Sequence, residues 1–117
     1  MRTQIRTAQQ KIYSSGYQAI VSGAPLIWAH GLGVRPNIVQ CWLKCVTDEN
    51  GFIAGQITPL VGASLGNNQG VSLIVDEINL IVRYGSKPQV FTIVNASNGN
   101  TADLTNSHWN FMAEVYP

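Results

Sequence analysis

Strict alternation of apolar and polar residues marks two long segments of the chain as β-strands. In residues 37–47, one face carries Val39, Cys41, Leu43 and Cys45, and the other carries Gln40, Trp42 and Lys44. In residues 108–116, one face carries Trp109, Phe111, Ala113 and Val115. A two-residue period is that of a strand with one face buried in a core. We therefore predict that both segments belong to a sheet that is buried on one side.

Shorter apolar runs, separated by clusters of turn-forming residues, predict further strands. They cover residues 17–21, 26–30, 52–59, 71–75, 78–84 and 89–94. Residues 95–106 are rich in Asn, Ser, Thr and Gly and predict a long polar loop. Seven or eight short strands are typical of an antiparallel β-sandwich. We predict an all-β fold in which the sandwich domain comprises residues 17–117.

Residues 1–16 are polar and predict a short N-terminal arm. Arg2, Arg6 and Lys11 make this arm locally basic, because the first carboxylate of the chain is Asp48. A segment of this kind rarely stays ordered on its own, and two interpretations remain open. It is either a frayed tail or an arm that docks on a neighbouring subunit, in which case the three basic residues are candidate anchors.

The alternation also predicts which side chains form the core. The expected core residues are Val39, Cys41, Leu43, Cys45, Leu73, Val75, Leu80, Val82, Trp109, Phe111, Ala113 and Val115. Several positions on the opposite faces are apolar as well, namely Trp42, Ile74, Ile81, Phe91 and Met112. A sheet with apolar residues on its outer face needs a cover, and association with other subunits is the simplest one.

The composition supports the same interpretation. Hydrophobic residues make up 45% of the 117 residues, which is enough for a core. Charged residues make up only 11%, against roughly 25% in an average globular protein. Because surface charge is the main protection against association, we expect much of the surface to be covered by other subunits. The alternative is an ordinary β domain rich in Asn and Gln.

The charge and hydropathy of the chain also bear on its partners. A net charge of +1 provides no broad basic surface, so we expect no binding to nucleic acid. No apolar run is long enough to span a bilayer, so we expect no membrane insertion.

Cys41 and Cys45 lie four residues apart on one predicted strand, about 13 Å, which exceeds the ~7 Å Cα limit of a disulfide. We expect both to be core residues rather than a disulfide or a metal pair.

Candidate groups for catalysis or metal binding are sparse. Four of the six carboxylates lie in the turn dipeptides at residues 48–49 and 76–77, where a solvated surface role is expected. His30 and His108 are too few ligands for zinc. His30 is expected to hydrogen-bond the backbone of the turn at residues 31–33. We therefore predict a protein that is not an enzyme and has no catalytic residue, metal or cofactor.

Binding chemistry remains possible at the polar loops. Candidate loop contacts are Asn67, Asn68, Gln69, Asn98 and Asn100. Planar amides beside an aromatic face commonly hold sugars, and the chain offers Trp and Tyr residues for such a face. The same amides also form turns well, so turn chemistry is the competing explanation.

Three segments carry a resemblance to a known group of proteins. They read H-G-L-G-V-R-P-N-I-V-Q-C-W-L-K-C-V-T-D-E-N-G-F-I-A-G, G-V-S-L-I-V-D-E-I-N-L-I-V-R-Y-G and N-A-S-N-G-N-T-A-D-L-T-N-S-H-W-N-F-M-A-E-V-Y. In this order they resemble a recurring domain of tailed-bacteriophage virion proteins. That domain is similar to tail-fibre tips and to H-type-lectin-like sandwiches, and the likeness covers roughly residues 20–117.

The resemblance implies a structural component of the virion that assembles in the host cytoplasm. It implies an antiparallel sandwich, a homotrimer and contact with other virion proteins, and it carries over no catalytic residue. A tail fibre has a long shaft, whereas only about twenty residues precede the domain here. A capsid decoration, a head-fibre base or a tail-appendage knob is therefore expected. The alternative function is a lectin-like module that binds a host-surface glycan, although no sugar-binding motif can be matched.

Overall fold

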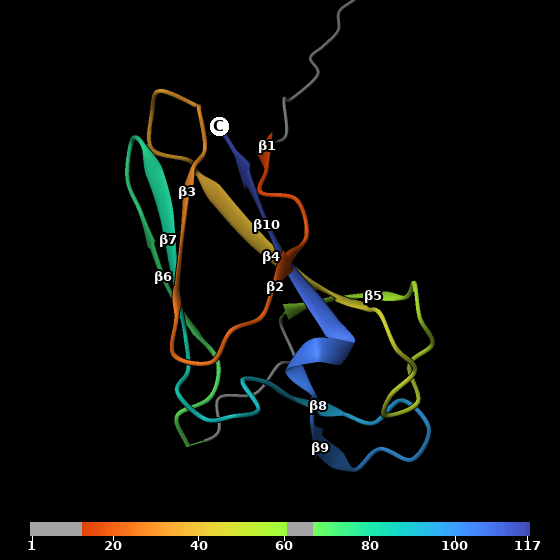
Figure 1. Cartoon of the computed structure of the whole chain (residues 1–117). Coiled ribbons are helices and arrows are strands. Elements are labelled where there is room, and N and C mark those ends of the chain that lie inside the picture. Colours follow the sequence, from red (N-terminus) through yellow and green to blue (C-terminus); the bar gives the residue numbers. More distant parts are fainter. Residues whose placement is uncertain (1–12, 61–66) are drawn as a thin grey trace, which may run out of the picture.

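The computed structural model describes residues 13–60 and 67–117. Within them, a five-stranded antiparallel sheet has the order β1-β10-β4-β5, and β2 also pairs with β10. Its strands are β1 (Tyr13–Ser14), β2 (Gln18–Ala19), β4 (Ile38–Cys45), β5 (Ile57–Pro59) and β10 (Trp109–Tyr116). The predicted long strands thus become β4 and β10, which pair along their whole length (Figure 1).

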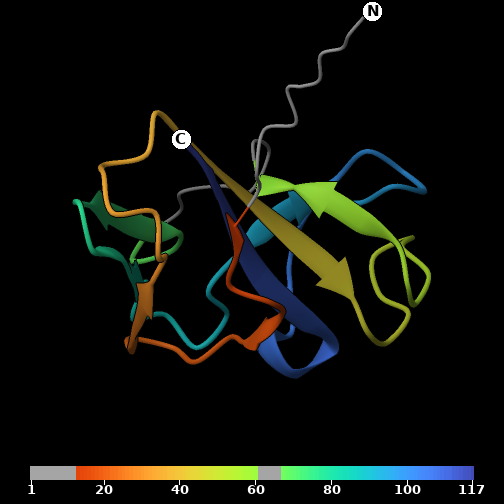
Figure 2. The same cartoon turned by 90° about the horizontal axis from the view of Figure 1, so that it is seen from above.

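A second, three-stranded sheet faces the first, and a small hairpin extends the structure. The second sheet has the order β3-β7-β6, formed by β3 (Pro25–Ala29), β6 (Val71–Val75) and β7 (Asn79–Tyr84). The hairpin consists of β8 (Thr92–Val94) and β9 (Thr101–Asp103), and the 3-10 helix η2 (Asn106–His108) leads into β10. Viewed from above, the three-stranded sheet lies to one side of the long β4–β10 pair (Figure 2). The fold is all-β and sandwich-like, as predicted.

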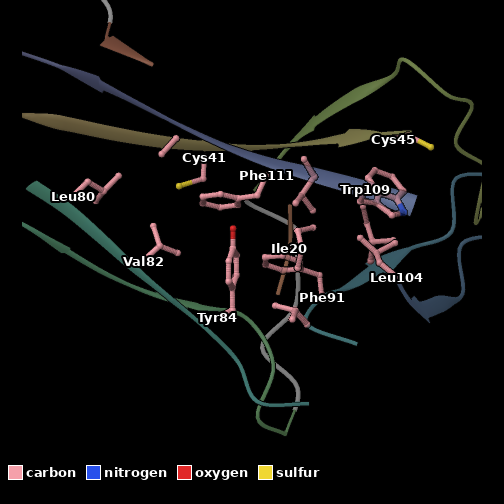
Figure 3. Close-up of a cluster of buried hydrophobic side chains, with 14 of the residues drawn as sticks. Ile20, Cys41, Cys45, Leu80, Val82, Tyr84, Phe91, Leu104, Trp109 and Phe111 are labelled. Atoms are coloured by element: carbon pink, nitrogen blue, oxygen red, sulfur yellow. The ribbon is translucent and has the colours of Figure 1, made fainter. Parts of the chain in front are cut away.

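The core lies between the two sheets and follows the alternation of β4 and β10. Every predicted inward residue of β10 is at most 1% exposed, and Cys41, Leu43 and Cys45 of β4 are also buried. Leu80, Val82 and Tyr84 of β7 approach them from the opposite sheet (Figure 3). Both cysteines are free and buried, as predicted, and burial raises the pKa of the Cys41 thiol to about 11.

Aromatic side chains fill the space where the two sheets and the hairpin meet. Tyr84 makes edge-to-face contacts with Phe91 and Phe111, with ring centroids 6.4 and 5.6 Å apart. Phe52 packs in the same manner on Trp109, at 5.3 Å. Edge-to-face geometry aligns the positive edge of one ring with the negative face of the other. These contacts connect the segment around Phe52 and the β7 strand to β10.

Three predictions about these segments are wrong. The predicted loop at residues 95–106 contains β9 and part of η2, and its Leu104 is 1% exposed in the core. Phe91 was expected on an outer face but is 1% exposed, because it precedes β8 and turns inward beside Tyr84. Leu73 was expected in the core but is 43% exposed. It pairs with Val82 on the inward face of β6, an outermost strand of the sheet.

Part of the predicted arm belongs to the five-stranded sheet. Tyr13 and Ser14 form β1 against β10, and the amide of Ser15 donates to the carbonyl of Ala113 at 2.9 Å. The amide of Ala113 in turn donates to the Ser15 hydroxyl oxygen at 2.9 Å. The candidate anchors Arg2, Arg6 and Lys11 lie outside the described residues.

Within the described ranges, no helix is long and apolar enough to cross a membrane.

Candidate functional site

A row of isoleucines crosses the outer face of the three-stranded sheet. Strand register places Ile27 of β3 opposite Ile81 of β7, and Ile81 opposite Ile74 of β6. Ile27 is 64% exposed and Ile74 is 58% exposed, whereas Ile81 on the central strand is half-buried between them. Cross-strand neighbours on one face of a sheet lie close enough to form a continuous surface. The exposed apolar face predicted from the sequence is therefore present, and we call these three residues the isoleucine row.

The two sides of the isoleucine row differ in charge. On one side of the row, Arg83 lies two residues beyond Ile81 on β7. It pairs with Pro25 of β3 and with Ser72 of β6. On the other side of the row, Asn79 lies two residues before Ile81 on β7. Asp76 lies next to Asn79, where the β6–β7 turn begins. We call the Arg83 side of the row the basic end and the Asp76 side the acidic end, and Arg35 borders the same hollow as Asp76 and Glu77 at the acidic end.

A hollow of about 460 Å³ adjoins the basic end. We call it the Arg83 hollow, and it is lined by Gly23, Asn68, Gln69, Gly70, Val71, Ser72, Arg83, Tyr84, Gly85 and Ser86. The Arg83 guanidinium donates to the carbonyl of Gly23 at 3.1 Å, which holds it against the wall. At Gly85 the backbone of residue 68 approaches closely, since a Cβ atom there would lie 2.3 Å from the carbonyl oxygen of Asn68. A glycine at position 85 is therefore needed to form the hollow.

The predicted loop contacts separate into two groups. Asn68 and Gln69 line the Arg83 hollow, whereas Asn67, Asn98 and Asn100 do not. The Asn98 side chain accepts a hydrogen bond from the amide of Asn100 at 2.9 Å, within the turn between β8 and β9. Turn formation, which the sequence offered as the alternative to ligand binding, therefore accounts for the Asn98 amide.

The Gln69 side chain is largely engaged within the protein. Its amide nitrogen donates to the Gln89 carbonyl and to the Asp103 carboxylate, both at 3.0 Å, and its oxygen lies 2.8 Å from the Thr92 hydroxyl oxygen. Hydrogen bonds from Thr92, Gln69 and Lys87 lower the pKa of Asp103. This cluster fixes Gln69, one of the residues that line the hollow.

The acidic end of the outer face is a rigid turn at residues 76–78. The Asp76 carboxylate accepts hydrogen bonds from the amides of Ile78 and Asn79 at 2.8 and 2.7 Å, and these bonds lower the pKa of Asp76. Glu77 is exposed, and the Ile78 side chain beside it is 67% exposed. We call residues 76–78 the acidic turn, and it presents an apolar and a negative side chain together.

His30 holds the acidic turn in place from the core side. Its ring is 2% exposed, and Nε2 lies 2.8 Å from the Asp76 carbonyl oxygen, to which it donates. Nδ1 accepts from the amide of Leu32 at 3.2 Å. The amide of His30 also donates to the Ile78 carbonyl at 3.0 Å. The predicted role of His30, hydrogen bonding to the backbone of its own turn, is confirmed.

A second polar cluster surrounds Glu49, which the sequence analysis placed in a solvated turn. That prediction is wrong, because the side chain is only 15% exposed. Its carboxylate accepts from the amide and hydroxyl of Thr105, from Nε1 of Trp109 at 2.9 Å and from Nδ1 of His108 at 3.0 Å. Burial by itself raises the pKa of Glu49, but these hydrogen bonds outweigh it and leave the pKa below its ordinary value.

The Glu49 cluster fixes the turn after β4 to the start of β10. Its only hydroxyl, that of Thr105, donates to the carboxylate rather than to a histidine, so it lacks the arrangement of an activated nucleophile. No signal along the sequence identified it, because its members come from segments that are distant in the chain. Within residues 13–60 and 67–117, no group of three or more His, Cys, Asp or Glu residues is placed to hold a metal ion.

No family model matches this chain, and no curated protein matches it. By its exposed residues and its hollow, the candidate site is the outer face of the three-stranded sheet, with its isoleucine row, Arg83 hollow and acidic turn.

Proposed function

We propose that this protein is a non-enzymatic structural component of a bacteriophage virion, which works as an oligomer attached to the capsid or the tail. The observation that carries the proposal is the isoleucine row, an exposed apolar surface on a regular sheet. Contiguous apolar patches on an outer sheet face are characteristic of surfaces that contact other proteins. The virion context comes from the resemblance of the sequence to phage virion domains, and the three-fold symmetry that the resemblance implies stays a prediction.

The low charge of the chain supports an assembled state. Further apolar residues are more than half exposed on other elements, among them Ile38, Ile53 and Val94. With charged residues at only 11% of the sequence, little repulsion opposes association. Contacts with other virion proteins would cover these residues, and the basic residues Arg2, Arg6 and Lys11 would anchor the chain on an acidic partner surface.

The test is made on purified particles of the phage whose genome encodes the chain. Peptide mass spectrometry of gradient-purified particles should find the protein in a fixed ratio to the major capsid protein. A variant with Arg2, Arg6 and Lys11 all changed to Ala should fold as the wild type and be depleted from particles. Protein that is abundant in the lysate and absent from particles would refute the virion assignment. Undiminished incorporation of the triple variant would refute only the anchoring role.

A glycan-binding module is the second candidate, and the Arg83 hollow is the observation that favours it. The residues that line the hollow include Asn68, Ser72, Arg83 and Ser86, whose side chains carry amide, hydroxyl and guanidinium groups. Such groups form the paired hydrogen bonds that fix a polar ligand in a shallow site. A glycan array probed with purified wild-type protein and with Arg83→Ala separates the candidates. Hits that the variant loses would support the lectin-like function, and an array without hits would remove it.

A further inference from the structure

We infer that two copies of this chain pack face to face through their three-stranded sheets, with the acidic turn of each copy seated in the Arg83 hollow of the other. The partner is thus a second copy of the same chain. The inference specifies the oligomer contact that the proposed function leaves open. It departs from the three-fold symmetry implied by the resemblance.

The geometry of the outer face is self-complementary. The isoleucine row runs across the strands, with the basic end on one side and the acidic end on the other. A two-fold axis that runs along the row relates the two copies. Each isoleucine of the row then faces the same isoleucine of the partner copy, and the strands of the two copies run in opposite directions. Arg83 of one copy then lies over Asn79 and Asp76 of the partner copy, and the reverse contact forms by symmetry. Such an isologous contact, in which each patch meets its own equivalent, is the commonest in homo-oligomers.

The hollow and the acidic turn lie on opposite sides of the row. The hollow includes Arg83 and Tyr84 at the end of β7 and Gly85 directly after it, which follow Ile81 by two to four residues. The acidic turn precedes Ile81 by three to five residues, and its Ile78 is 67% exposed. Rotation about the row therefore brings the exposed Glu77 and Ile78 over the hollow. In the described residues, neither Arg83 nor Glu77 forms an ion pair within its own chain.

The contact area also favours use of the hollow. Five residues along each of three strands cover a rectangle of roughly 14 by 17 Å, or about 240 Å² in projection. A specific interface buries about 800 Å² of accessible surface on each partner, so the sheet face alone is small. Insertion of the acidic turn into the hollow adds contact at both ends. We therefore expect a dimer whose population rises with protein concentration.

Charge reversal tests the contact on the full chain. Arg83→Glu and Glu77→Arg each place like charges together at both ends of the interface, and each should weaken the dimer about tenfold or more. The double variant exchanges the two charges and should restore the dimer. Sedimentation over a range of concentrations measures the association, and circular dichroism checks that each variant is folded. Two single variants that dissociate while the double variant reassociates would establish the pairing of positions 77 and 83.

The isoleucine row needs its own variant and a matched control. Ile74→Lys should give a monomer, because it places a charge within the apolar contact. Ile53→Lys changes an equally exposed isoleucine, 59% against 58%, on the segment between β4 and β5, and should leave the dimer unchanged. A trimeric mass, a wild-type monomer at every concentration, or a dimer that tolerates Ile74→Lys would overturn the contact. None of these outcomes decides whether the protein is a virion component, because that is measured on particles.

Discussion

At the scale of single residues, burial and hydrogen bonding decide the role of each polar side chain. Glu49 and Asp76 both lie in turns where the sequence predicts solvated carboxylates. Glu49 is nevertheless enclosed by Thr105, His108 and Trp109, whereas Asp76 binds only backbone amides of its own turn. The difference arises from segments more than fifty residues away in the chain, which local sequence patterns do not report.

The Glu49 cluster predicts a specific dependence of stability on pH. Because the folded-state pKa of Glu49 is lowered, its contribution is complete above the ordinary glutamate pKa of about 4.3 and is lost as the pH falls through the folded value. Glu49→Gln should lower the free energy of unfolding at pH 7 and should make that free energy depend less on pH in the acid range. Urea unfolding of both proteins between neutral and acidic pH measures this. An unchanged acid slope in the variant would show that other carboxylates dominate.

We expect that removing the Tyr84 hydroxyl, by Tyr84→Phe, does not destabilise the protein. This hydroxyl is buried and has no hydrogen-bond partner, and burial raises the pKa of the phenol. Leaving a buried polar group unsatisfied costs about 1–3 kcal/mol, so Tyr84→Phe should be neutral or stabilising while it keeps the ring contacts with Phe91 and Phe111. Thermal unfolding measures the change. A clear loss of stability would mean that the hydroxyl has a partner, such as a buried water.

At the scale of elements, the alternation of β4 and β10 is the strongest determinant of the fold. Their predicted inward faces are buried except for Val39, which is half-buried, and their pairing from Trp109 opposite Cys45 to Tyr116 opposite Ile38 joins the two longest strands of the described residues. Short elements behave differently, because a strand of two or three residues has too few alternating positions to signal itself. The strand β9 is of this kind, and Leu104, which follows it and precedes the 3-10 helix η2, is buried although no local alternation marks it.

The inward face of β10 predicts a large effect of Trp109→Ala. Trp109 is 1% exposed, packs edge-to-face on Phe52 and donates to Glu49, so the substitution leaves a cavity and an unsatisfied carboxylate. A loss of roughly 3–5 kcal/mol in the free energy of unfolding is expected from the cavity. Chemical denaturation measures it, with Ile53→Ala as an exposed control that should change little. Near wild-type stability of the Trp109 variant would contradict the core described here.

The close approach at Gly85 predicts that the Arg83 hollow depends on one glycine. Gly85→Ala would place Cβ against the backbone of residue 68, so the backbone of residues 67–70 must shift or the variant loses stability. Ser86→Ala is the neighbouring control and should leave both stability and fold unchanged. Comparison of the two variants by thermal unfolding and amide NMR shifts measures the effect. An alanine at position 85 without either change would contradict the close approach.

At the scale of the whole molecule, the outer face of the three-stranded sheet is the main functional expectation. The isoleucine row was predicted in part, since Ile74 and Ile81 follow from alternation, whereas Ile27 joins them only through the pairing of β3 with β7. The Arg83 hollow likewise assembles residues from three separate segments. A surface made by several strands is a product of register, and register is set by contacts along the full sheet.

The sequence by itself determined the all-β class, the two long strands, the burial of both cysteines and the presence of outward apolar residues. These properties depend on local alternation, which a strand expresses residue by residue. Only the tertiary structure decided the Glu49 cluster, the burial of Phe91 and Leu104, and the arrangement of basic end, isoleucine row and acidic turn on one face. These depend on which distant segments meet, and that choice follows from packing of the whole core rather than from any single stretch of the chain.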